Sequence, residues 1–473
     1  MANTTNAAAN KISVWEDDPE ENVQVRVARP DPSKSPLAFS IAGEAPQPDN
    51  QLGSAGWRYW TAAVALRRCA DFWAPQIPSG NWQVGQTLPV VLDQGADLNA
   101  YYDREALRFF HGPGPSGTVY SGESPDVTCH EMGHAILDTI KPQLWAVQAH
   151  EAAAFHESFG DMSAILSALQ LPSLRAAILR DTHGHLYCSS RLSRLAEQLG
   201  TAIRVCRPDA VQPDCLRNAV NSFAYQDPIT IPPLAPAAQV SSEPHSFSRI
   251  FTGAFFEALS GILTNRAANH QAPTDQELQT VSRDMADILV AGIRQAPVVA
   301  NFYAQVAAGM IRAGSRKNLI YGRILAGVFV GRGILSFEAA ATAEALQEAA
   351  AVALAAVAPI AAGPTAELAI VALPAAHYGL DQPLVIDAPS QPQQFFATAA
   401  GGDAAPIAPA SSTTAAKAFV DDLFRSGRVD YNGIGRPEAR LQHRPRLQTH
   451  ELVQQDGAVR LRRRMFDCGF QHH

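Results

Sequence analysis

Charged residues, cysteine and long apolar runs are all sparse in this chain of 473 residues, and each shortage excludes a class of protein. Only 17% of the residues are charged, and 45 Asp and Glu outnumber 37 Lys and Arg, which gives a net charge of −8. This balance argues against nucleic acid as a partner. Because 47% of the residues are hydrophobic, the chain can bury a large core, and its length favours two or three domains.

The six cysteines are too few and too scattered for a disulfide framework, and none forms a C-x-x-C pair. Cys206 and Cys215 are near enough in sequence to bridge. Free thiols are the favoured interpretation, because no export signal is present.

Neither a secretion signal nor a membrane span is evident. Residues 1–21 lack an apolar segment and turn acidic, and the longest apolar stretch, 349–362, is short and contains Pro359. We therefore expect a cytoplasmic protein with no membrane partner, exported, if at all, by a machine that needs no cleavable signal.

Changes in composition and periodicity divide the chain into five parts. We expect an N-terminal arm (1–55, with strand-like runs at 23–27 and 37–41), an α+β lobe (56–140), a helical lobe (141–336), an Ala/Pro-rich helix and linker (337–416), and a small basic region (417–473). The expected helices and strand are 57–73, 88–92 (strand), 126–140, 151–169, 190–199, 246–264, 274–294, 298–313 and 317–335. The low-complexity stretch 401–417 is typical of a flexible linker.

The basic region carries 11 Lys and Arg against 7 Asp and Glu, a net charge of +4. It contains a short helix pattern at 418–424 and a hairpin pattern at 450–462, with Asp456-Gly457 at the turn. Two interpretations stay open. The charges form a solvated hairpin face, or they form a docking surface, including one for the acidic body of the protein.

The strongest chemical signal is the string His130-Glu131-Met132-Gly133-His134. Residues four apart share a helix face, so both imidazoles reach one Zn²⁺ while Glu131 stands beside the water that such a metal activates. Metzincins would continue with Gly and His, but Leu137 and Ile140 occupy those places, which excludes that arrangement.

A second segment, residues 154–161, supplies a carboxylate as third ligand. Glu157 and Asp161 are four apart, so one can bind zinc while the other accepts the outer N–H of His130. Glu151 is the alternative third ligand, although no Asp follows it four residues later.

This combination resembles the thermolysin-like zinc metallopeptidases, the gluzincins. Four further motifs support the resemblance, which covers about residues 57–335: Asp126 before the zinc motif, Leu98-Asn99-Ala100-Tyr101-Tyr102, Leu216-Arg217-Asn218, and the segment from Pro244 to Ile250. The resemblance implies an α+β, bilobal fold with an α/β N-terminal lobe, a mostly helical C-terminal lobe and, in this chain, a C-terminal extension.

The resemblance also implies one Zn²⁺ per chain, held by His130, His134 and Glu157, and an endopeptidase acting on peptide or protein substrates. Glu131 would be the general base, and His245 would donate a hydrogen bond to the oxyanion.

Three more positions have implied roles. Asn99 and Ala100 would hold the substrate in extended form, and Arg217 would contact both Glu157 and the substrate carbonyl. Asp161 would orient His130.

The chain departs from the family pattern in three ways. No Tyr lies between His134 and Glu157, His156 stands where the family has Asn, and residues 162–180 contain no Asp or Glu. We therefore expect no double calcium site, and we expect His245 to carry more of the oxyanion stabilisation.

Other polar residues near these motifs have simpler interpretations. His150 and His156 are expected at the helix surface or in a loop, and Cys129 in packing. For Cys468 a buried or free thiol is the default. The alternative is that Cys468 binds the zinc and keeps the enzyme latent.

Two other functions compete with the peptidase. One is a weakened zinc-binding protein that holds peptides or partners through residues 337–473, and the other is a delivered protease effector or toxin. The presence of Glu131 favours catalysis, because a pure binder needs no carboxylate beside the metal.

Overall fold

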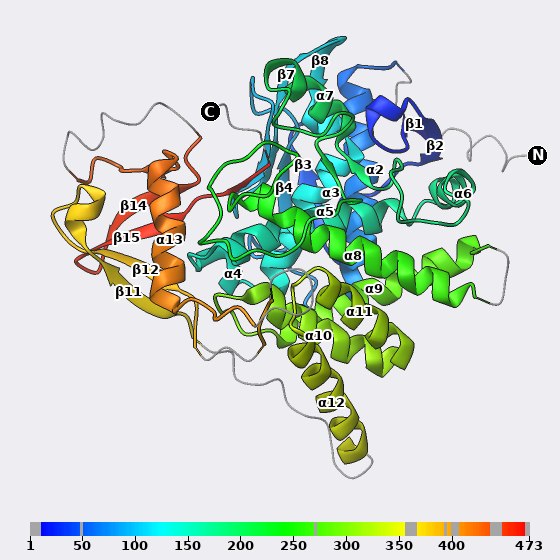
Figure 1. Ribbon diagram of the computed structural model, residues 1–473. Coiled ribbons are helices and arrows are strands. Elements are labelled where there is room, and N and C mark those ends of the chain that lie inside the picture. The colour runs from blue at the N-terminus through cyan, green and yellow to red at the C-terminus, as the bar shows by residue number, and fades with distance from the viewer. Residues whose placement is uncertain are drawn as a thin grey trace, which may run out of the picture.

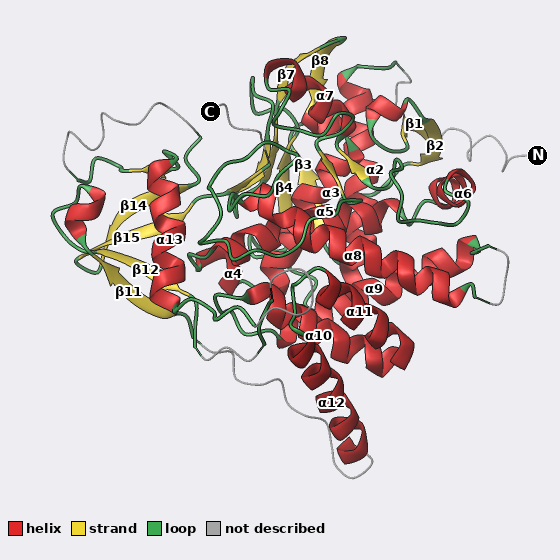
Figure 2. Ribbon diagram, in the orientation of Figure 1, coloured by secondary structure: helices red, strands yellow, loops and turns green. Residues whose placement is uncertain are grey.

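The computed structural model describes residues 11–47, 51–268, 272–354, 367–391, 395–398, 406–435 and 447–468. These residues form a mixed α/β structure with open sheets (Figure 2). Parts of the expected arm, linker and basic region lie outside the described residues.

A five-stranded sheet forms one layer, with strand order β16-β5-β6-β4-β3. The strands β3 and β4 and the strands β4 and β6 are parallel, whereas β5 is antiparallel to both β6 and β16. The bounds are β3 Ala38–Ile41, β4 Thr87–Val91, β5 Ala100–Tyr102, β6 Leu107–Phe109 and β16 Phe466–Asp467. The expected strands at 37–41 and 88–92 are confirmed, and the first of them lies in this sheet rather than in a peripheral arm.

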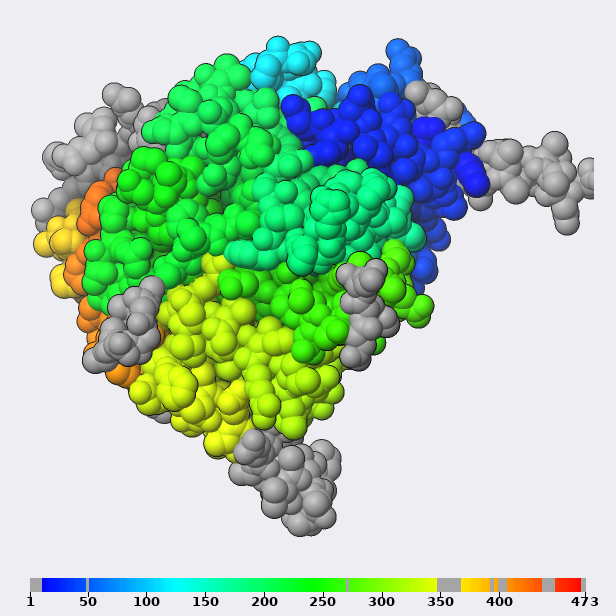
Figure 3. Space-filling model, turned by 45° about the vertical axis from the view of Figure 1, so that its right-hand side comes forward, coloured from blue at the N-terminus to red at the C-terminus, as the bar shows by residue number. Residues whose placement is uncertain are grey.

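The N-terminal segment packs against the body through buried side chains. Its two strands are β1 (Lys11–Trp15) and β2 (Gln24–Ala28), and the connection between them contains the buried acidic residues Glu16, Asp17 and Asp18. Glu16 accepts a hydrogen bond from Ser173 and pairs with Arg191 at 3.2 Å. Figure 3 shows this blue segment against the green surface formed by residues of the helical part.

Three helices build the centre of the molecule: α3 (Pro125–Ile140), α5 (His150–Ala168) and α8 (Pro244–Arg266). Ser124 caps α3 through the Val127 amide, and Pro125 at the first position suits a helix start. Both α3 and α5 are buried over nearly their whole length. The helix α2 (Ala55–Trp73) packs against α3 and begins at a Ser54 cap.

The remaining helices surround this centre. They are α4 Gln143–Ala146, α6 Pro172–Asp181, α7 Glu197–Cys206, α9 Asp275–Gln295, α10 Phe302–Lys317, α11 Leu319–Gly331 and α12 Phe337–Leu354 (Figure 1). Short two-stranded sheets are formed by β7 (His111–Gly114) with β8 (Gly117–Tyr120), and by β9 (Arg194–Leu195) with β10 (Arg217–Asn218). The expected helices are confirmed within a few residues of their bounds, with one exception.

The helix expected at 190–199 is wrong, because helix α7 begins only at Glu197. The Ser193 hydroxyl accepts from the Ser190 amide at 2.9 Å, and such a local side-chain bond competes with helix formation. Ala196 adopts a left-handed conformation with φ of 52°, which ends any helical run before α7.

The C-terminal part forms a second layer, in which α13 (Ser412–Arg425) covers a five-stranded sheet of order β11-β12-β15-β14-β13 (Figure 1). The strands are β11 Ala369–Leu373, β12 Leu384–Ala388, β13 Val429–Asp430, β14 His450–Gln455 and β15 Ala458–Arg463. The predicted hairpin is confirmed, with Asp456 and Gly457 at positive φ in the turn. The expected linker is wrong for residues 412–417, which belong to α13, while 401–405 lie outside the described residues.

After β15 the chain leaves this second layer and enters the first, where β16 pairs with β5. Figure 1 shows this red segment running from the left-hand layer into the body.

Within the described residues, no single helix is long and apolar enough to cross a membrane, although α5 and α6 pass that test as a pair bent by 98°.

Candidate metal centre

The helix α3 presents His130, Glu131 and His134 to one buried point of the interior. These side chains are 4%, 0% and 0% exposed. One turn separates the two histidines, and their ring centroids lie 4.9 Å apart. The spacing of the motif therefore produces the arrangement that the sequence predicted.

The neighbouring helix α5 brings Glu157 and Asp161 to the same point. His130 Nε2 lies 3.4 Å from Glu157 Oε2, and His134 Nε2 lies 3.8 Å from Glu157 Oε1. His130 Nδ1 faces Asp161 Oδ1 at 3.0 Å, so the two carboxylates contact opposite nitrogens of one ring. Glu157 occupies the place of a metal ligand, and Asp161 the place of its orienting partner.

A close approach of α3 and α5 makes these contacts possible. A Cβ atom on Gly160 would lie 2.6 Å from the His130 ring, and one on Gly133 would lie 3.0 Å from Gly160 Cα. Glycine at both positions therefore allows the two helices to pack closely enough for carboxylates and imidazoles to meet.

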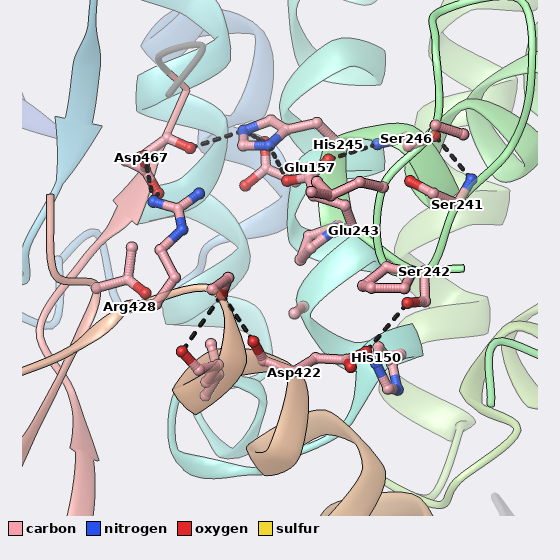
Figure 4. Close-up of a pocket in the computed structure, with 18 of the residues that line it drawn as sticks. His150, Glu157, Ser241, Ser242, Glu243, His245, Ser246, Asp422, Arg428 and Asp467 are labelled. Carbon is pink, nitrogen blue, oxygen red and sulfur yellow. Dashed lines mark hydrogen bonds and ion pairs between the residues drawn. The ribbon is translucent and has the colours of Figure 1, made fainter. Parts of the chain in front are cut away.

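His245 reaches the centre from the first turn of α8. Its Nε2 lies 3.3 Å from Glu157 Oε2 and donates to the backbone oxygen of Asp467 at 2.7 Å (Figure 4). On the other side, His245 Nδ1 contacts Glu243 at 2.6 Å, and Glu243 also accepts from the Ser246 amide as the helix cap. Glu243 thus fixes the orientation of His245.

Arg217 lies beside the centre, with a partner other than the one expected. Its guanidinium donates to both oxygens of Asp161 at 2.8–3.2 Å and approaches His130 Nδ1 at 3.4 Å. No direct hydrogen bond joins it to Glu157 among the described residues. The expected contact of Arg217 with Glu157 is therefore wrong as a hydrogen bond, because Asp161 on α5 lies nearer to the guanidinium.

The strand β5 runs past the centre between β16 and β6. Ala100 begins the strand, and Asn99 directly precedes it. The Asn99 side chain accepts from the Ala100 amide at 2.8 Å, while Ala100 O accepts from the Cys468 amide at 2.8 Å. The backbone that was expected to hold a substrate therefore holds the C-terminal strand of the same chain.

That strand carries a thiol into the centre. Cys468 Sγ lies 3.4 Å from His134 Nε2 and 3.7 Å from Glu157 Oε2. The Glu131 carboxylate, buried and without a hydrogen bond of normal geometry, lies within 4.8 Å of the sulfur. Phe466 stacks on His156 at 3.9 Å and on His134 at 5.3 Å.

The charges around the centre shift its pKa values in opposite directions. Burial would lower the pKa of His130, but the hydrogen bonds to Asp161 and Glu157 raise it to about 9. Burial raises the pKa of Glu131 to about 8. Burial would also raise the pKa of Asp161, but Arg217 and His130 lower it to about 2. Asp161 is therefore a permanent anion behind His130.

The donor set fits a zinc ion. Two imidazoles and a carboxylate are ligands that zinc prefers, and His130 Nε2 is buried without a hydrogen bond of normal geometry. The separations between neighbouring donor atoms of these side chains and Cys468 Sγ are 3.4–3.8 Å, so the side chains can contribute to one metal site.

Other candidate ligands lie away from this centre. Glu151 accepts from the Tyr225 hydroxyl at 2.6 Å and from the Tyr303 amide at 2.7 Å, so its carboxylate serves packing of the helices. The surface or loop positions expected for His150 and His156 are wrong, because both are buried. His150 contacts Asp422 of α13 at 2.9 Å.

A cavity of about 570 Å³ opens beside the centre, between α8 and the second layer. Glu157, Glu243 and His245 line one side, and Asp422 and Arg428 line the other (Figure 4). This volume is in the range of known ligand sites.

Comparison with known proteins adds nothing to this geometry. No protein-family model matches the chain, and no curated protein matches it.

Sequence reasoning missed two contributors to the centre. Glu243 was not singled out, although an acidic residue two positions before His245 is a usual helix cap. Phe466 was missed as well, and no local pattern marks it, because its partners His134 and His156 are more than 300 residues away in sequence.

Proposed function

We propose that the chain is a zinc-dependent endopeptidase with a thermolysin-like, bilobal arrangement around the α3–α5 helix pair. The convergence of His130, His134 and Glu157 is the observation that supports this proposal most strongly. These three residues would hold the ion. When bound, zinc polarises the scissile carbonyl and lowers the pKa of a water molecule towards about 7.

Glu131 is the general base of the proposed reaction. It is the only carboxylate of the zinc motif, it is buried, and it has no structural partner of normal geometry that would account for its position. It accepts a proton from the attacking water and later delivers it to the leaving amine.

His245 and β5 position the peptide. His245 Nε2 already donates to a peptide carbonyl, that of Asp467, which shows that it reaches an extended strand on β5. In the reaction the same nitrogen donates to the oxygen that becomes negatively charged. Loss of such a donor costs typically about 2.7–4 kcal/mol of transition-state stabilisation.

The substitution Glu131→Gln tests the proposal. The amide keeps the size of the side chain but accepts no proton, so we expect unchanged zinc content and loss of hydrolysis by at least a hundredfold. Zinc content is measured by mass spectrometry under native conditions, and hydrolysis with a labelled casein.

The matched control is Glu338→Gln, an exposed glutamate of α12, which should change neither quantity. Turnover retained in the Glu131→Gln variant would refute the role of Glu131. If neither the original protein nor the variant contains zinc after dialysis against a zinc-containing buffer, the metal site itself is refuted.

A further inference from the structure

We propose that Cys468 is a fourth ligand of the zinc and that the strand β16 occupies the substrate position, so that the folded chain is latent. This inference rests on the proposed zinc site and adds its regulation. Two independent observations support it: the position of the sulfur and the pairing of the backbone.

The sulfur lies among the donor atoms of the proposed metal site. Cys468 Sγ is 3.4 Å from His134 Nε2 and 3.7 Å from Glu157 Oε2, and it lies within 4.8 Å of donor atoms of His130 and Glu131. Cys468 is 4% exposed, and the neighbours named above all carry atoms that can bind a metal. A cysteine that served only packing would not need this position.

The backbone on both sides of the thiol binds like an extended peptide. Phe466 pairs with Tyr102 and Asp467 with Tyr101 in antiparallel register, and the Cys468 amide donates to Ala100 O. The Asp467 carbonyl accepts from His245. A peptide that adds to a sheet edge is held by the same kind of main-chain hydrogen bonds. The strand therefore fills the edge that a substrate needs.

Side chains of the strand fix it in place. The Phe466 ring stacks on His134 of α3 and on His156 of α5, and the Asp467 carboxylate pairs with Arg428 at 3.0 Å. Arg428 belongs to the second layer, directly before β13. The strand is thus anchored to both layers rather than lying loosely in the groove.

Zinc held by two histidines, one glutamate and one thiolate has no position left for water. On coordination the thiol gives its proton to solvent and the sulfur lone pair forms the bond to the metal, with no oxidation or reduction. Because the ligand belongs to the same chain, its effective concentration is of the order of millimolar or higher. A peptide substrate has to displace it before hydrolysis begins.

The first test uses Co²⁺ in place of Zn²⁺ in the full-length protein. A cobalt-bound thiolate gives a sulfur-to-metal charge-transfer band in the near ultraviolet. We expect this band in the original protein and in Cys206→Ser, whose thiol is exposed and distant, and its loss in Cys468→Ser. Bound cobalt without the band in the original protein would overturn the proposal, and that result needs no variant to fold.

The second test measures latency. Cys468→Ser and Cys468→Ala should raise casein hydrolysis at least tenfold over the original protein and should speed zinc loss to a chelator, while Cys206→Ser changes neither. Equal rates of hydrolysis in the original protein and the three variants would overturn the proposal that the folded chain is latent.

The two proposals fail in distinguishable ways. A charge-transfer band that depends on Cys468, together with no hydrolysis in any variant, supports thiolate ligation and refutes the peptidase. Hydrolysis that depends on Glu131 but not on Cys468 supports the peptidase and refutes the latent state.

Discussion

Asp161 orients the His130 ring, a proposed zinc ligand. Its carboxylate contacts His130 Nδ1 at 3.0 Å and is itself gripped by Arg217. Because Asp161 stays ionised, it accepts a hydrogen bond from the Nδ1 proton of His130, so a metal would bind at Nε2 in place of the proton on that nitrogen. The two carboxylates on α5 therefore contact opposite sides of the ring, Glu157 on the side of the proposed metal and Asp161 behind it.

The third ligand is tested by a pair of substitutions. Glu157→Gln should lower zinc affinity at least a hundredfold, because it removes a charged ligand at the centre. Glu151→Gln should leave zinc affinity within about threefold, because its carboxylate faces Tyr225 and Tyr303 instead. Both are measured by competition with a chromophoric chelator.

The reverse order of effects would assign the third ligand to Glu151. Folding of both variants is checked by circular dichroism, so that loss of structure is not mistaken for loss of a ligand.

At this scale the sequence predicted which side chains come together at the centre, but it predicted their surroundings poorly. The intervals within His130–His134 and Glu157–Asp161 are local, so helix geometry alone places them on one face. The partner of Arg217 depends on how a long segment between α7 and α8 folds back onto α5, and no local pattern contains that information. The burial of His156 has the same cause, because Phe466 covers it.

At the scale of elements, the crossing of α3 and α5 controls the centre. The two helices pack tightly against each other, and Gly133 and Gly160 lie where they meet. A glycine inside a helix destabilises it by roughly 1 kcal/mol relative to alanine. The presence of Gly160 in α5 therefore has a local reason. That reason is the His130 ring.

Gly160→Ala should therefore lower zinc affinity at least tenfold while the protein stays folded. The new Cβ would lie 2.6 Å from the ring, which has to move away from Glu157 and Asp161. Affinity is again measured by chelator competition, and folding by thermal unfolding.

Gly327→Ala in α11 is the matched control, because no atom lies within 4 Å of its new Cβ. It should leave zinc affinity unchanged and stabilise the protein by up to about 1 kcal/mol. Equal zinc affinity in the two variants would show that the α3–α5 distance does not control the site.

Most elements follow from local sequence. The helices α2, α3, α5, α8 and α9 have clear apolar patterns or caps, such as the capping box of Thr274 and Glu277. A helix was also expected at 190–199, but the Ser193 hydroxyl accepts from the Ser190 amide and donates to the Ser190 carbonyl, and Ala196 turns the chain. Local side-chain bonds of this kind override periodicity.

At the scale of the whole molecule, the N-terminal segment introduces buried negative charge. Asp17 is 2% exposed, and one of its oxygens has no hydrogen-bond partner. Burial raises its pKa to about 7, with Arg191 and Arg68 opposing the shift and Asp18 adding to it. Burial also raises the pKa values of Asp18, Asp126 and Glu197 nearby.

These shifts predict a protein that loses stability as the pH rises. The folded state keeps the Asp17 proton up to about pH 7, whereas the unfolded chain releases it near pH 4, so folding takes up a proton between these values. The free energy of unfolding of the metal-free protein should fall from pH 4 to pH 8, by a few kcal/mol in total.

Asp17→Asn should flatten this slope, because the amide has no proton to lose. The exposed Asp181→Asn should keep it. Urea unfolding followed by tryptophan fluorescence at several pH values measures both, and a slope that is equal in the two variants would contradict the role of Asp17.

Pairing between strands far apart in the sequence is the part of the fold that the sequence did not predict. The short strand β16 has no pattern of its own, and its pairing with β5 joins residues more than 360 positions apart. Only the chemistry of Cys468 hinted at a role near zinc, and the sequence alone favoured an ordinary thiol. Pairing over such distances is set by tertiary packing rather than by propensity.

The place of β16 at the sheet margin has a consequence for handling the activated protein. With that strand displaced, Ala100–Tyr102 would become an open border of unpaired amides and carbonyls, which other molecules can extend by cross-chain pairing. Protein with β16 displaced should therefore tend to form oligomers at high concentration. A peptide inhibitor that pairs with β5 should keep it monodisperse.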